Sequence, residues 1–155
     1  MMPRLVSRAA VLLVALFSFH AVASPAHRDR TAQGDVTGKW LAQTQDGVFH
    51  IFHCGAEICG RLVGMDYEGP VPHDVLGRSQ CDLTMLTGFT PQGDGQWQGK
   101  IFDPEGGKVY DAIIWSPSPN VLKLRGYLLG IPLLGRTQTW TRYTGHIGPA
   151  CKMTK

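Results

Sequence analysis

The sequence predicts an all-β domain that folds as a single up-and-down antiparallel barrel of about eight strands. Three observations favour this fold. The chain of 155 residues carries 19 glycines and 10 prolines, so turns recur at short intervals. Between these turns lie short runs in which apolar and polar residues alternate, as in strands with one buried face. No window of about eleven residues or more keeps a helical 3.6-residue period without a glycine or proline, which argues against a helical bundle.

The stretch from Gln96 to Tyr143 organises the fold, because it reads as four consecutive strands joined by tight turns. Trp97, Gly99 and Ile101 alternate with polar residues, and the DPEGGK that follows has the composition of a chain reversal. The next run, Val109 to Trp115, is β-branched and aromatic. The SPSPN after it is expected to end the pairing, because proline donates no ladder hydrogen bond. Two more alternating strands follow, separated by a GIP turn.

The segments before this stretch supply four more strands, which brings the expected total to eight. Eight antiparallel strands in sequence order close into a barrel without edges, wide enough to be filled by side chains or to hold one small ligand. The expected strands lie near Val36–Gln45, Val48–Cys54, Cys59–Asp66, Cys81–Phe89, Gln96–Phe102, Lys108–Trp115, Val121–Leu129 and Leu133–Tyr143.

The first 23 residues are expected to be a secretory signal peptide. Arg4 and Arg8 precede an apolar run, and Ala21-Val22-Ala23 fits a signal peptidase site. Cleavage after Ala23 predicts a periplasmic or secreted protein. The apolar run is too short for a spanning helix, which takes roughly 20 residues. Residues 24–35 are then expected to be a flexible leader, residues 36–144 the barrel and residues 145–155 a C-terminal tail.

The mature chain is close to neutral. Removing two arginines with the signal from 15 basic residues leaves 13, against 12 acidic ones, so the formal charge is 13 − 12 = +1. Nucleic-acid binding normally requires a strongly basic face, and we therefore expect no nucleic-acid partner.

The first expected strand begins with Gly38-Lys39-Trp40. A glycine lets backbone segments pack tightly, and an indole can plug one end of a barrel. The last strand carries Arg136 and Arg142, which could lie across the ring as cation–π partners. Gly38, Trp40 and Arg142 are therefore the candidates for closing the barrel.

The four cysteines are expected to form two disulfides, because an exported chain meets an oxidising compartment. Cys54 and Cys59 flank four residues, so a four-residue hairpin loop would set their sulfurs opposite each other. The pairing of Cys81 with Cys151 is then inferred mainly because these are the two remaining cysteines. Such a bond would tie the tail to the barrel wall.

A metal site is the alternative use of these cysteines, together with His50, His53 and His73. It is disfavoured because His50 and His53 are three residues apart on a strand, so their side chains point to opposite faces. No metal and no cofactor are expected.

Several motifs together resemble one known family. These are the Gly-x-Trp near the start, CGAEICG, GQWQGKIFDPEGGKVYDA and LKLRGYLLGIPLLGRTQTWTR, in addition to the signal peptide. The chain is similar, over nearly all of its mature length, to the bacterial exported family called domain of unknown function 2147. The resemblance implies a lipocalin-like or fatty-acid-binding-protein-like barrel, and no established reaction, ligand or catalytic residue. Asp82 stands where similar sequences tend to have glycine.

Binding of a small molecule is the first function hypothesis. An arginine beneath an apolar cavity could anchor an acidic head group while aromatic side chains hold the tail, so the ligand would be hydrophobic or amphiphilic and in one version acidic. Alternatively, the arginines lie on the outer face or only stack on Trp40. One strand parity is shared by Arg136, Gln138, Trp140 and Arg142, and Arg125 shares its parity with Tyr127. The ligand-binding candidates are Arg125, Tyr127, Arg136, Trp140, Tyr110 and Trp97.

Two other function classes stay open. A structural or partner-binding envelope protein would have a solidly packed barrel. An enzyme, such as an uncharacterised hydrolase, is disfavoured because no G-x-S-x-G, H-E-x-x-H or phosphate-binding loop occurs. Asp103, Glu105 and Asp111 cluster in sequence, but the first two belong to a turn that needs polar residues in any case. No catalytic residue is assigned.

Overall fold

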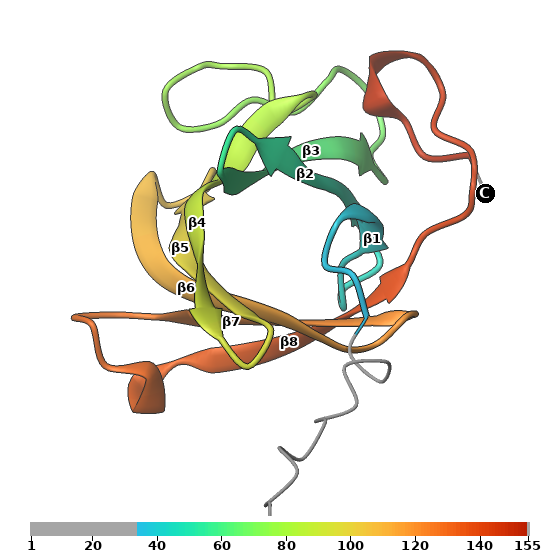
Figure 1. Cartoon of the computed structure of the whole chain (residues 1–155). Helices are drawn as coiled ribbons and strands as arrows, with labels where there is room; N and C mark the ends of the chain where they lie inside the picture. The colour runs from blue at the N-terminus through green and yellow to red at the C-terminus, as the bar shows by residue number, and fades with distance from the viewer. Residues whose placement is uncertain (1–33, 155) are drawn as a thin grey trace, which may run out of the picture.

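The computed structural model describes residues 34–154, which form a closed barrel of eight antiparallel strands in sequence order (Figure 1). The proposed signal peptide and all but the last two residues of the expected leader lie outside the described residues. The strands are β1 (Gly38–Leu41), β2 (Gly47–Cys54), β3 (Glu57–Met65), β4 (Leu83–Gly93), β5 (Gln96–Asp103), β6 (Lys108–Ser118), β7 (Val121–Tyr127) and β8 (Arg136–Arg142).

The barrel is closed by the pairing of the first strand with the last. In this seam Trp40 of β1 lies opposite Arg142 of β8, and Leu41 lies opposite Thr141. Every strand therefore has two antiparallel neighbours, and the predicted up-and-down barrel is confirmed.

Alternation along the strands and their register show which side chains face the interior. On β7, Leu122 and Leu124 are buried, and they lie opposite Trp140 and Gln138 of β8. The next inward position pairs Gly126 with Arg136 in the same register. The even-numbered positions of β8 therefore face inward, and the threonines between them face outward.

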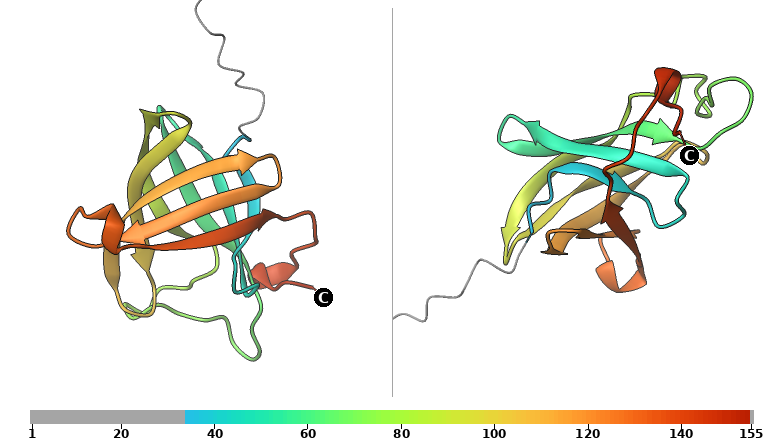
Figure 2. Two further views of the ribbon diagram at one scale, coloured as in Figure 1. Left: turned by 90° about the horizontal axis from the view of Figure 1, so that it is seen from below. Right: turned by 90° about the vertical axis from the view of Figure 1, so that its right-hand side faces the viewer.

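The core fills one half of the barrel. Fully buried side chains come from nearly all the strands and include Trp40, Ile51, Ile58, Leu86, Phe89, Ile114, Leu122 and Trp140. In Figure 2 the β2–β3 and β4–β5 hairpins lie at one end of the barrel, and the long β3–β4 connection lies at the other. Because the apolar packing is concentrated toward the hairpin end, the opposite end is left open for a pocket.

Two strands continue through prolines that lie beyond their expected ends at Trp115 and Phe89. β6 extends past Pro117 to Ser118, which pairs with Val121, so the prediction that pairing stops at SPSPN is wrong. A register irregularity between Trp115 and Ser118 accommodates the proline, and the buried Ser116 hydroxyl donates to the carbonyls of Ser118 and Val121. β4 likewise runs through Pro91 to Gly93.

Two disulfides cross-link the barrel, Cys54–Cys59 and Cys81–Cys151, as the sequence predicts. The expected geometry of the first is wrong, because Cys54 pairs with Glu57 across a two-residue turn and Cys59 lies diagonally beyond it. The second joins the end of the β3–β4 connection, two residues before β4, to the C-terminal tail. Two oxidised pairs are consistent with an exported protein.

The C-terminal tail lies against the start of the β3–β4 connection. The Met153 N–H donates to the Met65 carbonyl at 2.9 Å, and the Tyr67 hydroxyl donates to the Ala150 carbonyl at 2.9 Å. Together with the Cys81–Cys151 bond, these contacts hold Tyr67 in place at the open end of the barrel.

Candidate functional site

The end of the barrel that carries the β2–β3 hairpin is plugged by Trp40. Its side chain is fully buried, and its Nε1–H donates to the Val36 carbonyl at 2.8 Å. The guanidinium carbon of Arg142 lies 3.7 Å from the centroid of the indole ring. A cation this close to a buried aromatic face makes a favourable cation–π contact.

Arg142 also connects two separate segments of backbone. Its guanidinium donates to carbonyls of the segment before β1 and of the β6–β7 turn, namely Thr37 at 2.5 Å, Asp35 at 3.0 Å and Pro119 at 2.9 and 3.1 Å. Burial lowers the pKa of Arg142, while the nearby Asp35 carboxylate opposes this effect. Because the pKa of an arginine starts far above neutral, the side chain stays charged in any physiological solution.

Gly38 gives the Arg142 guanidinium its space. The residue has a φ of 109°, and a Cβ built there would lie 2.4 Å from Nη1 of Arg142. Only glycine combines this backbone conformation with the absence of a side chain. The structure thus places Gly38, Trp40 and Arg142 together in one plug.

The opposite end of the barrel holds a pocket of about 780 Å³. Its floor includes the rings of Phe49 and Trp140, which stack with centroids 4.5 Å apart and planes 17° from parallel. Apolar side chains from the walls complete the lower part; they include Leu62, Met65, Met85, Ile101 and Leu124. A pocket of this size and lining is typical of sites for small organic ligands.

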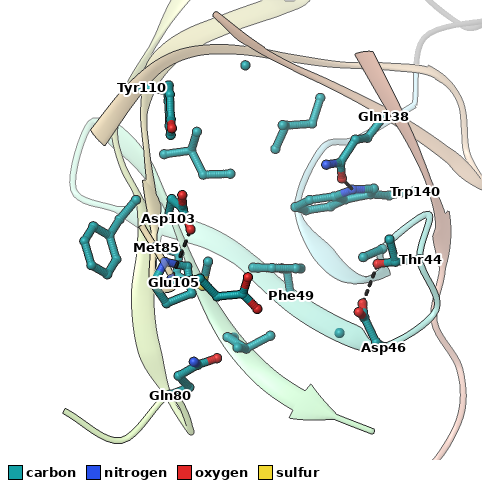
Figure 3. A pocket seen from close by; sticks show the side chains of 18 of the residues that line it. Thr44, Asp46, Phe49, Gln80, Met85, Asp103, Glu105, Tyr110, Gln138 and Trp140 are labelled. Atoms are coloured by element: carbon teal, nitrogen blue, oxygen red, sulfur yellow. Dashed lines mark hydrogen bonds between the residues drawn. The ribbon is translucent and has the colours of Figure 1, made fainter. Parts of the chain in front are cut away.

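Two polar side chains reach into this apolar space. Gln138 accepts a hydrogen bond from Trp140 Nε1 through its Oε1 at 2.8 Å, which leaves its amide nitrogen as a donor toward the pocket. Tyr110 lies on the opposite side, next to Asp103 (Figure 3). The pocket can therefore offer hydrogen bonds above an aromatic floor.

The mouth of the pocket carries more negative than positive side chains. The carboxylates come from the turns after β1, β3 and β5 and from the last residue of β5; they are Asp46, Asp66, Glu105 and Asp103. Arg136, at the start of β8, is the one cationic lining residue among those the structure describes. Figure 3 shows Asp103 and Glu105 across the pocket from Gln138 and Trp140.

The rim on the β3–β4 side is ordered by Asp74. Its carboxylate is buried and accepts hydrogen bonds from the backbone N–H groups of Leu76 and Arg78 and from the Arg78 guanidinium. Burial raises the pKa of Asp74, but the hydrogen bonds from Arg78 and Leu76 outweigh it, and the net pKa is lowered. Arg78 in turn lies 5.1 Å from the centroid of Phe102, a pocket residue, so this loop is docked on the pocket wall.

The residues expected to bind a ligand divide into two groups. Tyr110, Tyr127, Arg136 and Trp140 all line the pocket. Tyr127 does so from the edge, since it is buried and its hydroxyl accepts a hydrogen bond from Gln98 on the outer side of the sheet.

Arg125 and Trp97 lie away from the pocket. Arg125 points outward and donates to Thr137 and to the carbonyls of Pro132 and Leu133 in the β7–β8 connection. Trp97 packs against the core at the plugged end, with its ring 6.2 Å from that of His53. The alternation of side chains along a strand does not show whether Arg125 faces inward or outward. It also does not show at which end of the barrel Trp97 lies.

Sequence reasoning did not assign Phe49 or the acidic mouth. A signal for the mouth exists, because alternate connections of an up-and-down barrel lie at the same end. Asp46, Asp66 and Asp103 fall in the first, third and fifth connections or at their edges, so they must converge. The sequence carries no comparable signal for Phe49, because it does not show which apolar residue of β2 packs against Trp140 of β8.

Among the described residues, no group of three or more histidine, cysteine or acidic side chains is arranged to hold a metal ion. The same part of the chain contains no helix with the length and hydrophobicity needed to cross a membrane.

Comparison with known proteins agrees with this fold. A family model described as an uncharacterized protein conserved in bacteria, DUF2147, matches residues 38–142. A solved structure of protein HP1028 from Helicobacter pylori, described as belonging to the lipocalin family, superposes with a TM-score of 0.64 at 17% identity, over 72% of this chain and 84% of that chain. None of the curated proteins matches the sequence. The chain belongs to the DUF2147 family, and its fold is a lipocalin-like barrel.

Proposed function

We propose that this protein binds a small hydrophobic or amphiphilic molecule in the open end of its barrel, without chemical turnover. The observation that carries the proposal is the division of the barrel interior. One end is plugged by Trp40 and Arg142, whereas the other holds a pocket of about 780 Å³ above the stacked rings of Phe49 and Trp140. A solidly packed scaffold, the alternative considered above, would not need this space.

The lining suggests how such a ligand would lie. Its apolar part would rest on the Phe49–Trp140 pair, where apolar surface is removed from water. Its polar part would reach the level of Gln138 and Tyr110, whose amide and hydroxyl groups can orient it. Arg136 stands at the mouth beyond them.

The charges at the mouth favour a neutral or zwitterionic head group over a simple carboxylate. A carboxylate placed at Arg136 gains one attraction, but it also meets the fields of Asp46, Asp66, Asp103 and Glu105. The acidic ligand of the first hypothesis is therefore the less favoured version. A zwitterion could instead place its anion near Arg136 and its cation near the carboxylates.

Filling the pocket tests the proposal directly. Gly126 faces the pocket, its φ lies in the ordinary range, and a Cβ added there would have only Ile101 Cγ2 at 4.0 Å. In the Gly126→Leu variant the new side chain can enter the pocket without strain. The neutral fluorescent probe N-phenyl-1-naphthylamine should bind the unmodified protein, and Gly126→Leu should weaken this binding by about tenfold or more.

The matched control is Thr141→Leu, which places the same side chain on the outer face of β8. It should leave probe affinity unchanged. Absence of probe binding by the unmodified protein, or equal affinity in Gly126→Leu, would refute binding in this pocket.

Competition against the same probe tests the head group. Monolauroylglycerol and lauroyl lysophosphatidylcholine should displace the probe at lower concentrations than laurate, because all three share one acyl chain and differ in charge. Stronger competition by laurate would reinstate the acidic ligand.

A further inference from the structure

The connection between β7 and β8, residues 128–135, is the most apolar exposed segment of the described chain; we call it the leucine loop. Its large hydrophobic side chains are exposed to between 45% and 88%, and they are Leu128, Leu129, Ile131, Leu133 and Leu134. The loop projects from one side of the barrel (Figure 2). Apolar surface grouped in this way on a small protein usually marks a site of interaction.

The loop displays these side chains from an ordered backbone. A turn of 3₁₀ helix, Pro132–Leu134, is preceded and followed by backbone hydrogen bonds from Ile131 to Leu128 and from Gly135 to Pro132. Arg125 fixes the turn from the sheet by donating to the carbonyls of Pro132 and Leu133 at 2.7 and 3.3 Å. The apolar side chains are therefore held in place rather than collapsed onto the barrel.

Leucine is an unfavourable residue for the stability of the fold at position 129. It has a φ of 57°, in the left-handed region where glycine or asparagine is preferred, and its side chain is 87% exposed. Neither backbone strain nor exposure is offset by packing in the barrel. An apolar partner outside the molecule would account for both.

The charge around the loop indicates which apolar partner it fits. All 12 acidic residues of the chain precede Ala112, so the last 44 residues (155 − 111 = 44) include basic residues but no acid. Arg125 and Lys123 lie on the outward side of β7, three and five residues before the loop, and Arg136 follows the loop directly at the mouth of the pocket. Leucines flanked by cationic side chains match the interface of a lipid bilayer that contains anionic lipids.

The loop is also continuous with the pocket. Leu128 and Leu134 belong to both, and two further exposed apolar residues, Val75 and Leu76, lie on the β3–β4 loop at the same end of the barrel. A membrane that receives the leucine loop from the β7–β8 side would therefore lie beside the mouth, whose carboxylates belong to or adjoin the other three connections.

We propose that the leucine loop docks this protein on the surface of an anionic lipid bilayer, with Leu129 and Leu133 entering the interface and Lys123 and Arg125 facing the head groups. Docking does not depend on the proposed ligand. If the pocket does bind an amphiphile, docking would let that molecule pass between bilayer and barrel without crossing water.

Vesicle co-sedimentation tests the proposal with purified mature protein. Binding is expected to vesicles of phosphatidylcholine and phosphatidylglycerol, to be weaker with phosphatidylcholine alone, and to fall as NaCl is raised. The double variant Leu129→Asn, Leu133→Asn should lower the partition coefficient by about tenfold. Asparagine tolerates the left-handed backbone at position 129, so the fold is expected to persist, which circular dichroism can verify.

Leu76→Asn is the matched control, because it removes an exposed leucine from the other loop at the mouth. It should reduce partition by less than the double variant. Failure to bind either vesicle type overturns the proposal, and so does an equal loss in Leu76→Asn. A protein that forms dimers in solution, and loses them in the double variant, would assign the loop to a second copy of the chain instead.

Gly126→Leu separates the two proposals. This variant should lose the probe but still sediment with vesicles, whereas the double loop variant should keep the probe. Loss of both properties in Gly126→Leu would contradict the independence of the two sites.

Discussion

Arg142 lies with its guanidinium carbon 3.7 Å from the centroid of Trp40, at the seam where the first and last strands of the barrel pair. The same guanidinium donates to backbone carbonyls on both sides of the seam, at Thr37 and at Pro119. One side chain therefore fixes the indole, the segment before β1 and the β6–β7 turn. We therefore expect closure of the barrel at this end to depend on Arg142.

Replacing Arg142 with methionine should lower the free energy of unfolding by about 3 kcal/mol, because the carbonyls of Asp35, Thr37 and Pro119 lose a charged donor and Trp40 loses its cation. Lysine should not restore the stability, since one ammonium group cannot reach the same set of acceptors. Urea denaturation measures both variants. Arg125→Met is the control and should cost about 1 kcal/mol, because Arg125 bonds an exposed loop. Equal losses in the two variants would contradict the role of Arg142.

Gly38→Ala should destabilise the protein through two separable effects. The φ of 109° disfavours any side chain, and the new Cβ would collide with Nη1 of Arg142 at 2.4 Å. Gly69 has a φ of 77° with nothing within 4 Å of its added Cβ, so Gly69→Ala shows strain alone, at about 1 kcal/mol. We expect Gly38→Ala to lower the free energy of unfolding by about 2 kcal/mol more than Gly69→Ala does, as measured by urea denaturation. A difference near zero would mean that the guanidinium moves aside freely.

The two disulfides should contribute unequally to stability. In the chain-entropy account, a bond that closes a longer loop restricts the unfolded chain more. The separations of 70 residues for Cys81–Cys151 and 5 for Cys54–Cys59 predict contributions of about 4 and about 2 kcal/mol. Paired serine substitutions followed by thermal unfolding will rank them. The opposite ranking would show that strain or residual structure decides the outcome.

The β3–β4 rim should lose its order in acid because of Asp74. The lowered pKa of this carboxyl means that the folded state resists protonation more than the unfolded chain does. Its contribution to stability is therefore complete above about pH 4 and is lost as the pH falls through the lowered pKa. Amide NMR signals of Leu76 and Arg78, whose N–H groups donate to the carboxylate, should shift in that range. In Asp74→Asn this titration should vanish; a transition that persists there would belong to another group.

Much of the fold follows from local sequence patterns. Alternating apolar residues and frequent glycine and proline predict eight strands, and their order predicts the antiparallel meander that the structure confirms. The strand ends were less accurate, because Pro117 and Pro91 are absorbed by register irregularities that only the neighbouring strands can determine. The turn at Gly55-Ala56 is two residues long for the same reason: pairing continues to Cys54 and Glu57.

The pocket was only partly predictable. Parity groups Arg136 with Gln138 and Trp140, and all three line the pocket, but parity does not state which face of a strand is inside. Arg125 and Tyr127 illustrate the limit, since both lie on the outward parity of β7 and yet Tyr127 reaches the pocket edge. The boundary between plug and pocket depends on how large side chains from all the strands fill the cylinder. That packing is a tertiary property, which no single segment encodes.

The most direct test of the central claim is native mass spectrometry of the protein purified, without organic solvent, from cells that export it. We expect a reproducible additional mass that extracts into organic solvent, and we expect it to be absent from Gly126→Leu prepared in the same way. An additional mass that persists in Gly126→Leu would place the bound molecule elsewhere. A bare polypeptide mass in every preparation of the unmodified protein would contradict the binding role.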